Sequence, residues 1–279
     1  LFTLIDKKGN NKYSINTNNS DLCLNFLENI QDYSIKIKSL IDNLENSTGK
    51  AFIYSEYKQS EYGGTYLLGI ILQYYGYTRK TLNSKKLNID RILDNTNINK
   101  QKYYIMVDGS TSEEDFTAYK NIFNSDNNIE GNIIKIIIGT TNMIEGVSLN
   151  NVRQIHIMQP WYNISRNEQI VGRGVRQCSH IKLPFNMRNI TIFNYVAIST
   201  DLKEIDRNTY IIPYIDDKKT SIKQDIDLRR LYLATEKINK ITLLENLLKS
   251  NSVDCLLNKN INNIQIINLP KDRKDEIKT

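Results

Sequence analysis

Residues 167–180, NEQIVGRGVRQCSH, combine side chain types that could bind an anion. If a helix runs through them, one arc of about 100° carries four residues: Gln169, Gly172, Arg173 and Arg176. Two arginines one turn apart repel each other unless an anion lies between or opposite them. Guanidinium suits phosphate oxygens because it is always protonated and offers forked donors. The spacing predicts a phosphate-facing row, and an exposed basic helix face is the simpler alternative.

This helix is expected to begin near Ser165, because Ser165 and Glu168 have the spacing of a capping box. Gly172 and Gly174 lie inside the same segment. Each costs up to ~1 kcal/mol relative to alanine in a helix. We therefore expect the two glycines to allow a neighbouring group to approach closely.

The segment before it, IIIGTTNMIEGVSLNNVRQIHI, places a loop between two apolar strands. In open α/β sheets ligands gather at the carboxyl ends of strands, where this loop begins. Thr140 and Thr141 could donate hydrogen bonds to a nucleic-acid backbone, and Gly146 would let the main chain approach a ligand. An ordinary loop with a turn glycine is the alternative.

Short apolar strands alternate with helices along the chain. Strands are expected at 51–57, at 103–110 and in the two apolar runs around the loop, with another in RNITIFNYVA; helices are expected at 63–77 and 110–123, the second with Ser112 and Asp115 as a capping box. This alternation predicts an α/β fold with a mostly parallel sheet covered on both faces. We expect a linker at 1–34, the α/β domain at 35–205, and a helical extension and tail at 206–279.

Composition limits the class of protein. The 279 residues carry a net charge of +6, which is compatible with a polyanionic partner but does not establish one. The three cysteines have no paired spacing, so neither a metal site nor a disulfide framework is expected, and a reducing intracellular setting fits. No apolar run approaches the ~20 residues of a membrane span, so no membrane partner is expected.

Taken together, the motifs resemble a known family. GTTNMIEGVSL and QIVGRGVR are similar to motifs V and VI of superfamily 2 helicases, and KAFIYSEY occupies the place of motif IV. The wider context, with SVDCLLN downstream, resembles the helicases of large cytoplasmic DNA viruses. These include poxvirus nucleoside triphosphate phosphohydrolase I, the small subunit of the poxvirus early transcription factor, and giant-virus relatives. The resemblance covers about residues 35–260.

The resemblance implies the second RecA-like domain of a motor in which two such domains close on ATP. It makes Arg176 the expected arginine finger with Arg173 beside it as the catalytic pair. It assigns to ATP binding three further residues: Gln169, Gly172 and Gly146.

The same resemblance implies which residues face nucleic acid. Thr140 and Thr141 are expected to contact its backbone. Tyr54 and Ser55, at the end of the motif IV strand, are weaker candidates, and Ser55 could equally cap the next element.

A phosphate loop of the form G-x-x-x-x-G-K-[ST] is absent from the sequence. Gly49 and Lys50 form its only Gly-Lys pair, but Ala51 follows them and Leu44 stands where the first glycine should be. No strand is followed by the Asp-Glu pair that would hold the metal. The chain, which begins with Leu, is therefore expected to be part of a longer protein and inactive alone, with ATP and Mg²⁺ bound mainly by a missing N-terminal domain.

The expected activity of the whole protein is ATP hydrolysis stimulated by DNA, or by RNA, that drives translocation, strand separation or a transcription step. Expected partners are the N-terminal RecA-like domain and an RNA polymerase, in host cytoplasm or a virion. A non-catalytic module that binds nucleic acid or a polymerase is the alternative. The motor of a restriction enzyme is a third, but its nuclease motif is missing.

Several other residues have structural explanations. His156 is expected to be a strand residue satisfied by a neighbour, and His180 to cap the end of the motif VI helix. Trp161 and Tyr162 could stack on a base or pack against the turn before that helix.

Overall fold

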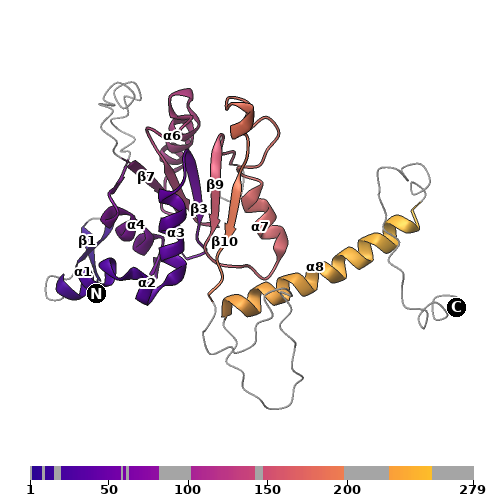
Figure 1. Ribbon diagram of the computed structural model, residues 1–279, viewed down its shortest axis with the longest axis horizontal. Coiled ribbons are helices and arrows are strands. Elements are labelled where there is room, and N and C mark those ends of the chain that lie inside the picture. The colour runs from indigo at the N-terminus through magenta and orange to yellow at the C-terminus, as the bar shows by residue number, and fades with distance from the viewer. Residues whose placement is uncertain are drawn as a thin grey trace, which may run out of the picture.

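The computed structural model describes residues 2–7, 10–15, 20–57, 59–60, 63–81, 102–141, 147–197 and 226–252. Its centre is a six-stranded sheet in the order β10-β9-β3-β8-β7-β6, in which every neighbouring pair is parallel (Figure 1). The strands are β3 (Lys50–Tyr54), β6 (Tyr77–Arg79), β7 (Lys102–Val107), β8 (Ile136–Gly139), β9 (Val152–Ile157) and β10 (Thr191–Asn194). β6 was not expected from the sequence.

The two faces of the sheet are covered by different helices. One face packs α1 (Ser20–Glu28), α2 (Ile30–Tyr33), α3 (Ile35–Glu45) and α4 (Thr65–Tyr74). The other packs α6 (Glu113–Asn124) and α7 (Ile164–Val171). Alternate residues of β3 enter the two cores, since Phe52 and Tyr54 belong to the second and Ala51 and Ile53 to the first. The predicted α/β fold, a RecA-like parallel sheet with helices on both faces and a C-terminal helical extension, is confirmed.

Small elements complete the described chain. They are two antiparallel hairpins, β1 (Phe2–Lys7) with β2 (Asn10–Ile15) and β4 (Gln59–Ser60) with β5 (Gly63–Gly64), and two 3-10 turns, η3 (Asp126–Asn128) and η5 (Phe185–Met187).

Residues 20–34 are part of the folded core. Leu27 of α1 and Ile30 of α2 are fully buried against the same cluster as Leu40 of α3. The linker expected before residue 35 is therefore helical and packed in this stretch. Phe26, Leu27, Ile30 and Tyr33 do recur at helical spacing there, but the Asn-rich residues before them favour a linker, and this hid the helical signal. The domain boundaries themselves stay predictions.

The helix caps agree with the sequence in one case and not in the other. The Ser112 hydroxyl accepts a hydrogen bond from the Asp115 amide at the start of α6, as predicted. The motif VI helix α7 begins at Ile164, with Asn163 as its N-cap and no side-chain cap. The capping box expected at Ser165 and Glu168 is therefore wrong, because the helix begins before Ser165.

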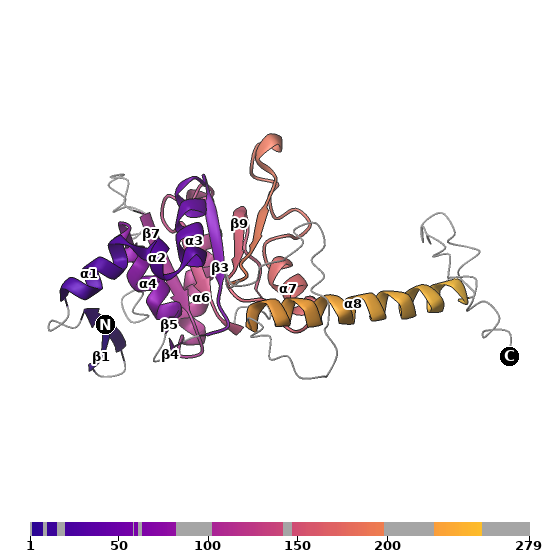
Figure 2. The ribbon, with the colours of Figure 1, turned by 60° about the horizontal axis from the view of Figure 1, so that its bottom comes forward.

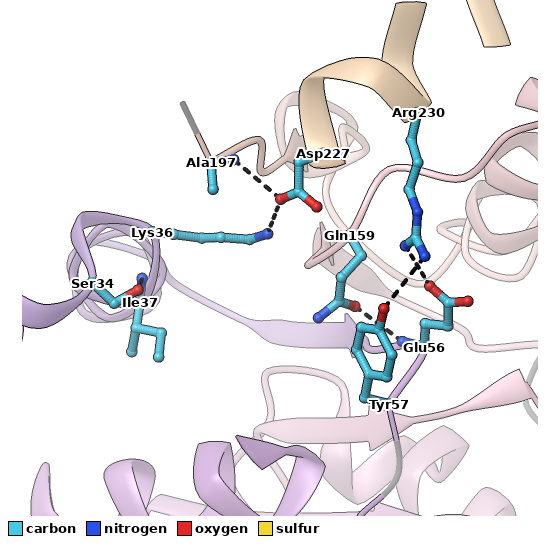
Figure 3. A network of polar contacts seen from close by, with 9 residues as sticks. All are labelled: Ser34, Lys36, Ile37, Glu56, Tyr57, Gln159, Ala197, Asp227 and Arg230. Carbon is cyan, nitrogen blue, oxygen red and sulfur yellow. Dashed lines mark hydrogen bonds and ion pairs between the residues drawn. The ribbon is translucent and has the colours of Figure 1, made fainter. Parts of the chain in front are cut away.

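α8 (Ile226–Ser250) is the helical extension that the sequence predicts within residues 206–279. Figure 1 and Figure 2 both show it starting below the sheet and running well beyond the body of the protein. Its first turns carry two ion pairs to the body, from Asp227 to Lys36 at 2.7 Å and from Arg230 to Glu56 at 2.8 Å. Figure 3 shows both pairs beside the end of β3. We call these two ion pairs the α8 clamp.

His156 behaves as a structural residue. Its ring is buried in β9, with Nδ1 2.9 Å from the Tyr195 hydroxyl and Nε2 3.0 Å from Gln154 Oε1. Burial lowers the pKa of His156 to about 3, so the ring is neutral at physiological pH. The prediction that a neighbour satisfies it is confirmed. None of the helices in the described ranges is long and apolar enough to cross a membrane.

Candidate functional site

The motif VI segment leaves the helix earlier than its sequence predicts. α7 ends at Val171, and Gly172 is its C-cap. The amides of Arg173 and Gly174 bond to carbonyls three residues back, Ile170 and Val171. Arg173 and Arg176 therefore lie in turns after the helix, so the single helical face proposed for all four side chains is wrong. Gln169 alone of the four is within α7, and its side chain is exposed.

Gly174 explains why the chain turns here. A Cβ at this position would lie 3.1 Å from Ile155 Cδ1 and 3.6 Å from Val152 Cβ, both on β9. The close approach expected at the glycines is therefore made here to the sheet. Gly172 has ordinary helical dihedral angles, and its carbonyl receives a bond from Arg176. The turn brings both arginines against residues 147–149.

Arg176 is exposed and bonded to neutral groups. Its Nε donates to the Gly172 carbonyl at 3.0 Å, and its Nη1 donates to the Ser148 hydroxyl. Within the described part of the chain, no carboxylate forms an ion pair with it. A guanidinium in this state keeps its full charge and donors that an incoming anion can recruit.

Arg173 is half-buried next to the same segment. Its Nη1 lies 3.4 Å from the Val147 carbonyl, and its own carbonyl accepts from the Leu149 amide at 2.8 Å. The structure therefore brings Arg173 and Arg176 together on residues 147–149. Sequence reasoning missed Ser148 as a partner of Arg176, although it lies inside the motif V match. The sequence showed only that Ser148 is a hydroxyl residue in a loop, and many loop residues have a hydroxyl.

The residues predicted to face nucleic acid lie at the carboxyl end of β8, with different exposure. Thr141 is exposed, whereas Thr140 is 3% exposed and donates its amide to the Val107 carbonyl at 3.3 Å. Gly146, assigned to ATP binding, lies outside the described residues. Thr141 is thus the threonine whose side chain a ligand can reach.

Tyr54 and Ser55 do not present their side chains to a ligand. Tyr54 is 2% exposed within the core under α6 and α7, and Ser55 is fully buried with its hydroxyl 3.3 Å from the Tyr57 carbonyl. Their expected contact with a nucleic-acid backbone is corrected on this ground. The β3 strand buries both faces up to its last residue, and the sequence run gave no sign of where burial ends.

Lys50 is not a phosphate-loop lysine. It is fully buried at the start of β3, and its Nζ donates to the Phe123 carbonyl at 2.7 Å and lies over the Phe123 ring. Burial lowers the pKa of Lys50 to about 7. This agrees with the sequence finding that Gly49 and Lys50 lack the rest of the loop.

The aromatic pair before α7 packs against arginines. The Arg166 guanidinium lies 4.5 Å from the Trp161 ring centre, and that of Arg230 lies 5.0 Å from the Tyr162 ring centre. This favours the packing explanation over base stacking. His180 does not cap the helix end as expected, because its Nε2 is 2.7 Å from the Val152 carbonyl at the start of β9.

The described residues suit a polyphosphate better than a metal ion. Arg173 and Arg176 offer donors to phosphate oxygens beside residues 147–149. No group of three or more His, Cys, Asp or Glu side chains that could hold a metal occurs among the residues that the structure describes.

Comparison with known proteins gives the family. The Helicase conserved C-terminal domain model matches residues 35–178, more than half of the chain, including Arg173 and Arg176. A protein of Acanthamoeba polyphaga mimivirus assigned as an ATP-dependent RNA helicase is 28% identical over 84% of this chain and 34% of its own length. A second mimivirus protein with the same assignment is 31% identical over 77% of this chain and 23% of its own length.

The chain is also similar to a third viral protein and to one solved structure. The termination factor NPH-I homolog of African swine fever virus is 24% identical over 82% of this chain and 34% of its length. A solved structure, the C-terminal part of the Fun30 ATPase domain, aligns with 63% of this chain and 48% of that chain at a TM-score of 0.41 and 19% identity, too low to support an argument. The chain spans 23% to 34% of the length of the three viral relatives. It belongs to the helicase conserved C-terminal domain family.

Proposed function

We propose that this chain is the second motor domain of a viral, ATP-dependent helicase or translocase that nucleic acid stimulates, and that Arg176 is its arginine finger. The observation that carries the proposal is the state of Arg176, an exposed cation fixed by one carbonyl and one hydroxyl. Its position in the matched family segment separates it from other exposed arginines.

ATP and Mg²⁺ would be held mainly by an N-terminal RecA-like domain of the same protein, because the required loop and acidic pair are absent from this sequence. Bound Mg²⁺ would neutralise charge on the phosphates. Arg176 would leave its neutral acceptors and donate to the γ-phosphate oxygens, with Arg173 and Gln169 beside it. The chain alone would hydrolyse no ATP.

The nucleic-acid contact would form at the carboxyl ends of the strands, opposite to the end of the sheet where Ser148 and the arginines lie. Thr141 lies beyond the carboxyl end of β8, whereas Ser148 precedes β9 by a few residues. Because β8 and β9 are parallel, the chain between them must return from the carboxyl edge of the sheet to the amino edge. This connection joins the proposed nucleic-acid contact to the segment that holds the arginines. DNA is the proposed ligand and RNA the second choice.

A role in transcription is proposed on the relative named as a termination factor. An RNA polymerase would then be a partner, and the site of action would be host cytoplasm or a virion. The alternative, a module that binds nucleic acid or a polymerase without turnover, predicts no ATP hydrolysis even in the full-length protein.

The test is steady-state ATP hydrolysis by the full-length protein with and without DNA. Arg176→Ala should lower kcat by ~10³-fold, the lower end for an arginine finger, while Arg176→Lys should recover only part of the loss. Arg188→Ala is the matched control, because Arg188 is exposed, donates to the carbonyls of Leu183 and Ile181, and lies outside residues 35–178.

Equal turnover in Arg176→Ala and Arg188→Ala would remove the finger assignment. Failure of the unaltered full-length protein to hydrolyse ATP, with DNA binding retained, would favour the non-catalytic module.

A further inference from the structure

Asn124, the last residue of α6, lies far in sequence from both arginines but bonds to the segment that holds them. Its side-chain Nδ2 donates to the Ser148 carbonyl at 2.8 Å, and its Oδ1 accepts from the Asn150 amide at 2.8 Å. One amide thus binds the main chain on both sides of Leu149, whose side chain is fully buried. These contacts fix the position of residues 148–150 relative to α6.

The same short segment supports the arginines. Val147 offers its carbonyl to Arg173 Nη1, Ser148 offers its hydroxyl to Arg176 Nη1, and Leu149 donates its amide to the Arg173 carbonyl. A shift of residues 147–149 would therefore move the acceptors of both guanidiniums at once.

The end of α6, which carries Asn124, is held by burial and by hydrogen bonds. Phe123, next to Asn124, is fully buried, and its carbonyl accepts from Asn128 Nδ2 at 3.1 Å and from Lys50 Nζ at 2.7 Å. The end of α6 is thus tied to η3 and to the start of β3. A side chain anchored there can hold a loop in one place, as a residue that supports a reactive group must.

We propose that Asn124 is a positioning residue for Arg173 and Arg176, acting through residues 147–150. The proposal rests on the proposed function, since it matters for turnover only if these arginines reach the nucleotide. Asparagine suits the role because it donates and accepts at once, which the Ser148 carbonyl and the Asn150 amide require. Aspartate would keep the acceptor but lose the donor and face the Ser148 carbonyl with negative charge.

The experiment uses the full-length protein and measures kcat and KM for ATP with saturating DNA. Asn124→Ala should lower kcat roughly tenfold, with KM changed less than about twofold, because the arginines act in the transition state rather than in ground-state binding. Asn124→Asp should lower kcat at least as much. Asn121→Ala, an exposed asparagine on the same helix, is the matched control and should leave both constants unchanged.

Two further measurements separate positioning from a general loss of structure. In a background that carries both Arg173→Ala and Arg176→Ala, Asn124→Ala should cause little further loss in kcat, because its effect passes through the arginine pair. Ser148→Ala, which leaves the Asn124 contacts with the main chain intact and removes only an acceptor that Arg176 leaves, should keep both kcat and the unfolding midpoint close to those of the unaltered protein. Hydrogen exchange at the Asn150 amide should speed up in Asn124→Ala and not in Ser148→Ala.

The outcomes are distinct. If Arg176→Ala is impaired while Asn124→Ala matches Asn121→Ala, the positioning role is overturned and the proposed function stands. A full additional loss from Asn124→Ala in the variant that lacks both arginines also overturns it. If Asn124→Ala fails to fold, the Asn124→Asp result decides, and normal turnover there overturns the proposal. Normal turnover in Arg176→Ala overturns the proposed function itself.

Discussion

Arg230 and Arg176 are the same residue type in opposite states. Arg230, in the α8 clamp, pairs with Glu56 at 2.8 Å, and the two side chains are only 11% and 18% exposed. Its Nη2 also lies 3.3 Å from the Tyr57 hydroxyl, and its guanidinium faces the Tyr162 ring (Figure 3). Arg176 is exposed, and among the described residues its side chain bonds to one carbonyl and one hydroxyl. Arg230 is committed to joining α8 to the body, and Arg176 is not committed to any anion.

Lys50 differs from both arginines. Like Arg176 it donates to a carbonyl, but its side chain is fully buried. Burial lowers the pKa of Lys50 to about 7, so its charge is partly lost near neutral pH, whereas a guanidinium is always protonated in proteins. The comparison teaches that a neutral partner alone does not indicate a ligand site. The combination of a neutral partner, exposure and the matched family segment supports the proposed ligand site at Arg176.

A loss of stability is expected when the Arg230 ion pair of the clamp is removed. Arg230→Ala should lower the free energy of unfolding by about 1–3 kcal/mol, because Glu56 is left partly buried without its cation. Urea unfolding of the chain measures this. Lys240→Ala is the control, since Lys240 and Glu236 are 3.5 Å apart and largely exposed, and its effect should stay under about 0.5 kcal/mol.

Equal effects of Arg230→Ala and Lys240→Ala would contradict the contrast between a committed and an uncommitted arginine. They would mean that the clamp contributes no more than a surface pair on α8.

Lys50 is expected to make the free energy of unfolding depend on pH. Burial places its folded pKa near 7, below the ordinary value of 10.5. Between these values the unfolded chain binds more protons, so Lys50 makes stability rise with pH, and below about pH 7 its penalty is constant. Lys50→Met should therefore be more stable than the unaltered chain at pH 7. That difference should shrink by about 1.4 kcal/mol per pH unit on going towards pH 10.

The Phe123 carbonyl keeps its bond from Asn128 in this variant, so no acceptor is orphaned. Lys182→Met, at an exposed lysine, is the control. If the unfolding free energies of Lys50→Met and the unaltered chain ran parallel from pH 7 to pH 10, Lys50 would be charged when folded.

Much of the fold could be predicted from the sequence because its signals are local. Continuous apolar runs indicated β3, β7, β8 and β9, and helical spacing indicated α4, α6 and α8. The hydroxyl of Ser112 indicated the start of α6. These features depend on neighbouring residues only, so no tertiary information was needed.

The site was less predictable because its geometry depends on distant contacts. The end of α7 is set by Gly174 meeting β9, and the burial of Tyr54 by α6 and α7. The contact between Asn124 and Ser148 joins residues 24 positions apart. Motif likeness brought Arg173 and Arg176 to attention but could not show which groups hold them.

The central claim is that Arg176 leaves Ser148 and Gly172 to reach the nucleotide. The direct measurement is an experimental structure of the full-length protein with DNA and an ATP transition-state analogue. The claim predicts the Arg176 guanidinium about 3 Å from an oxygen of the γ-phosphate mimic. A guanidinium still bonded to the Ser148 hydroxyl and the Gly172 carbonyl, with the analogue bound in a closed cleft, would contradict it.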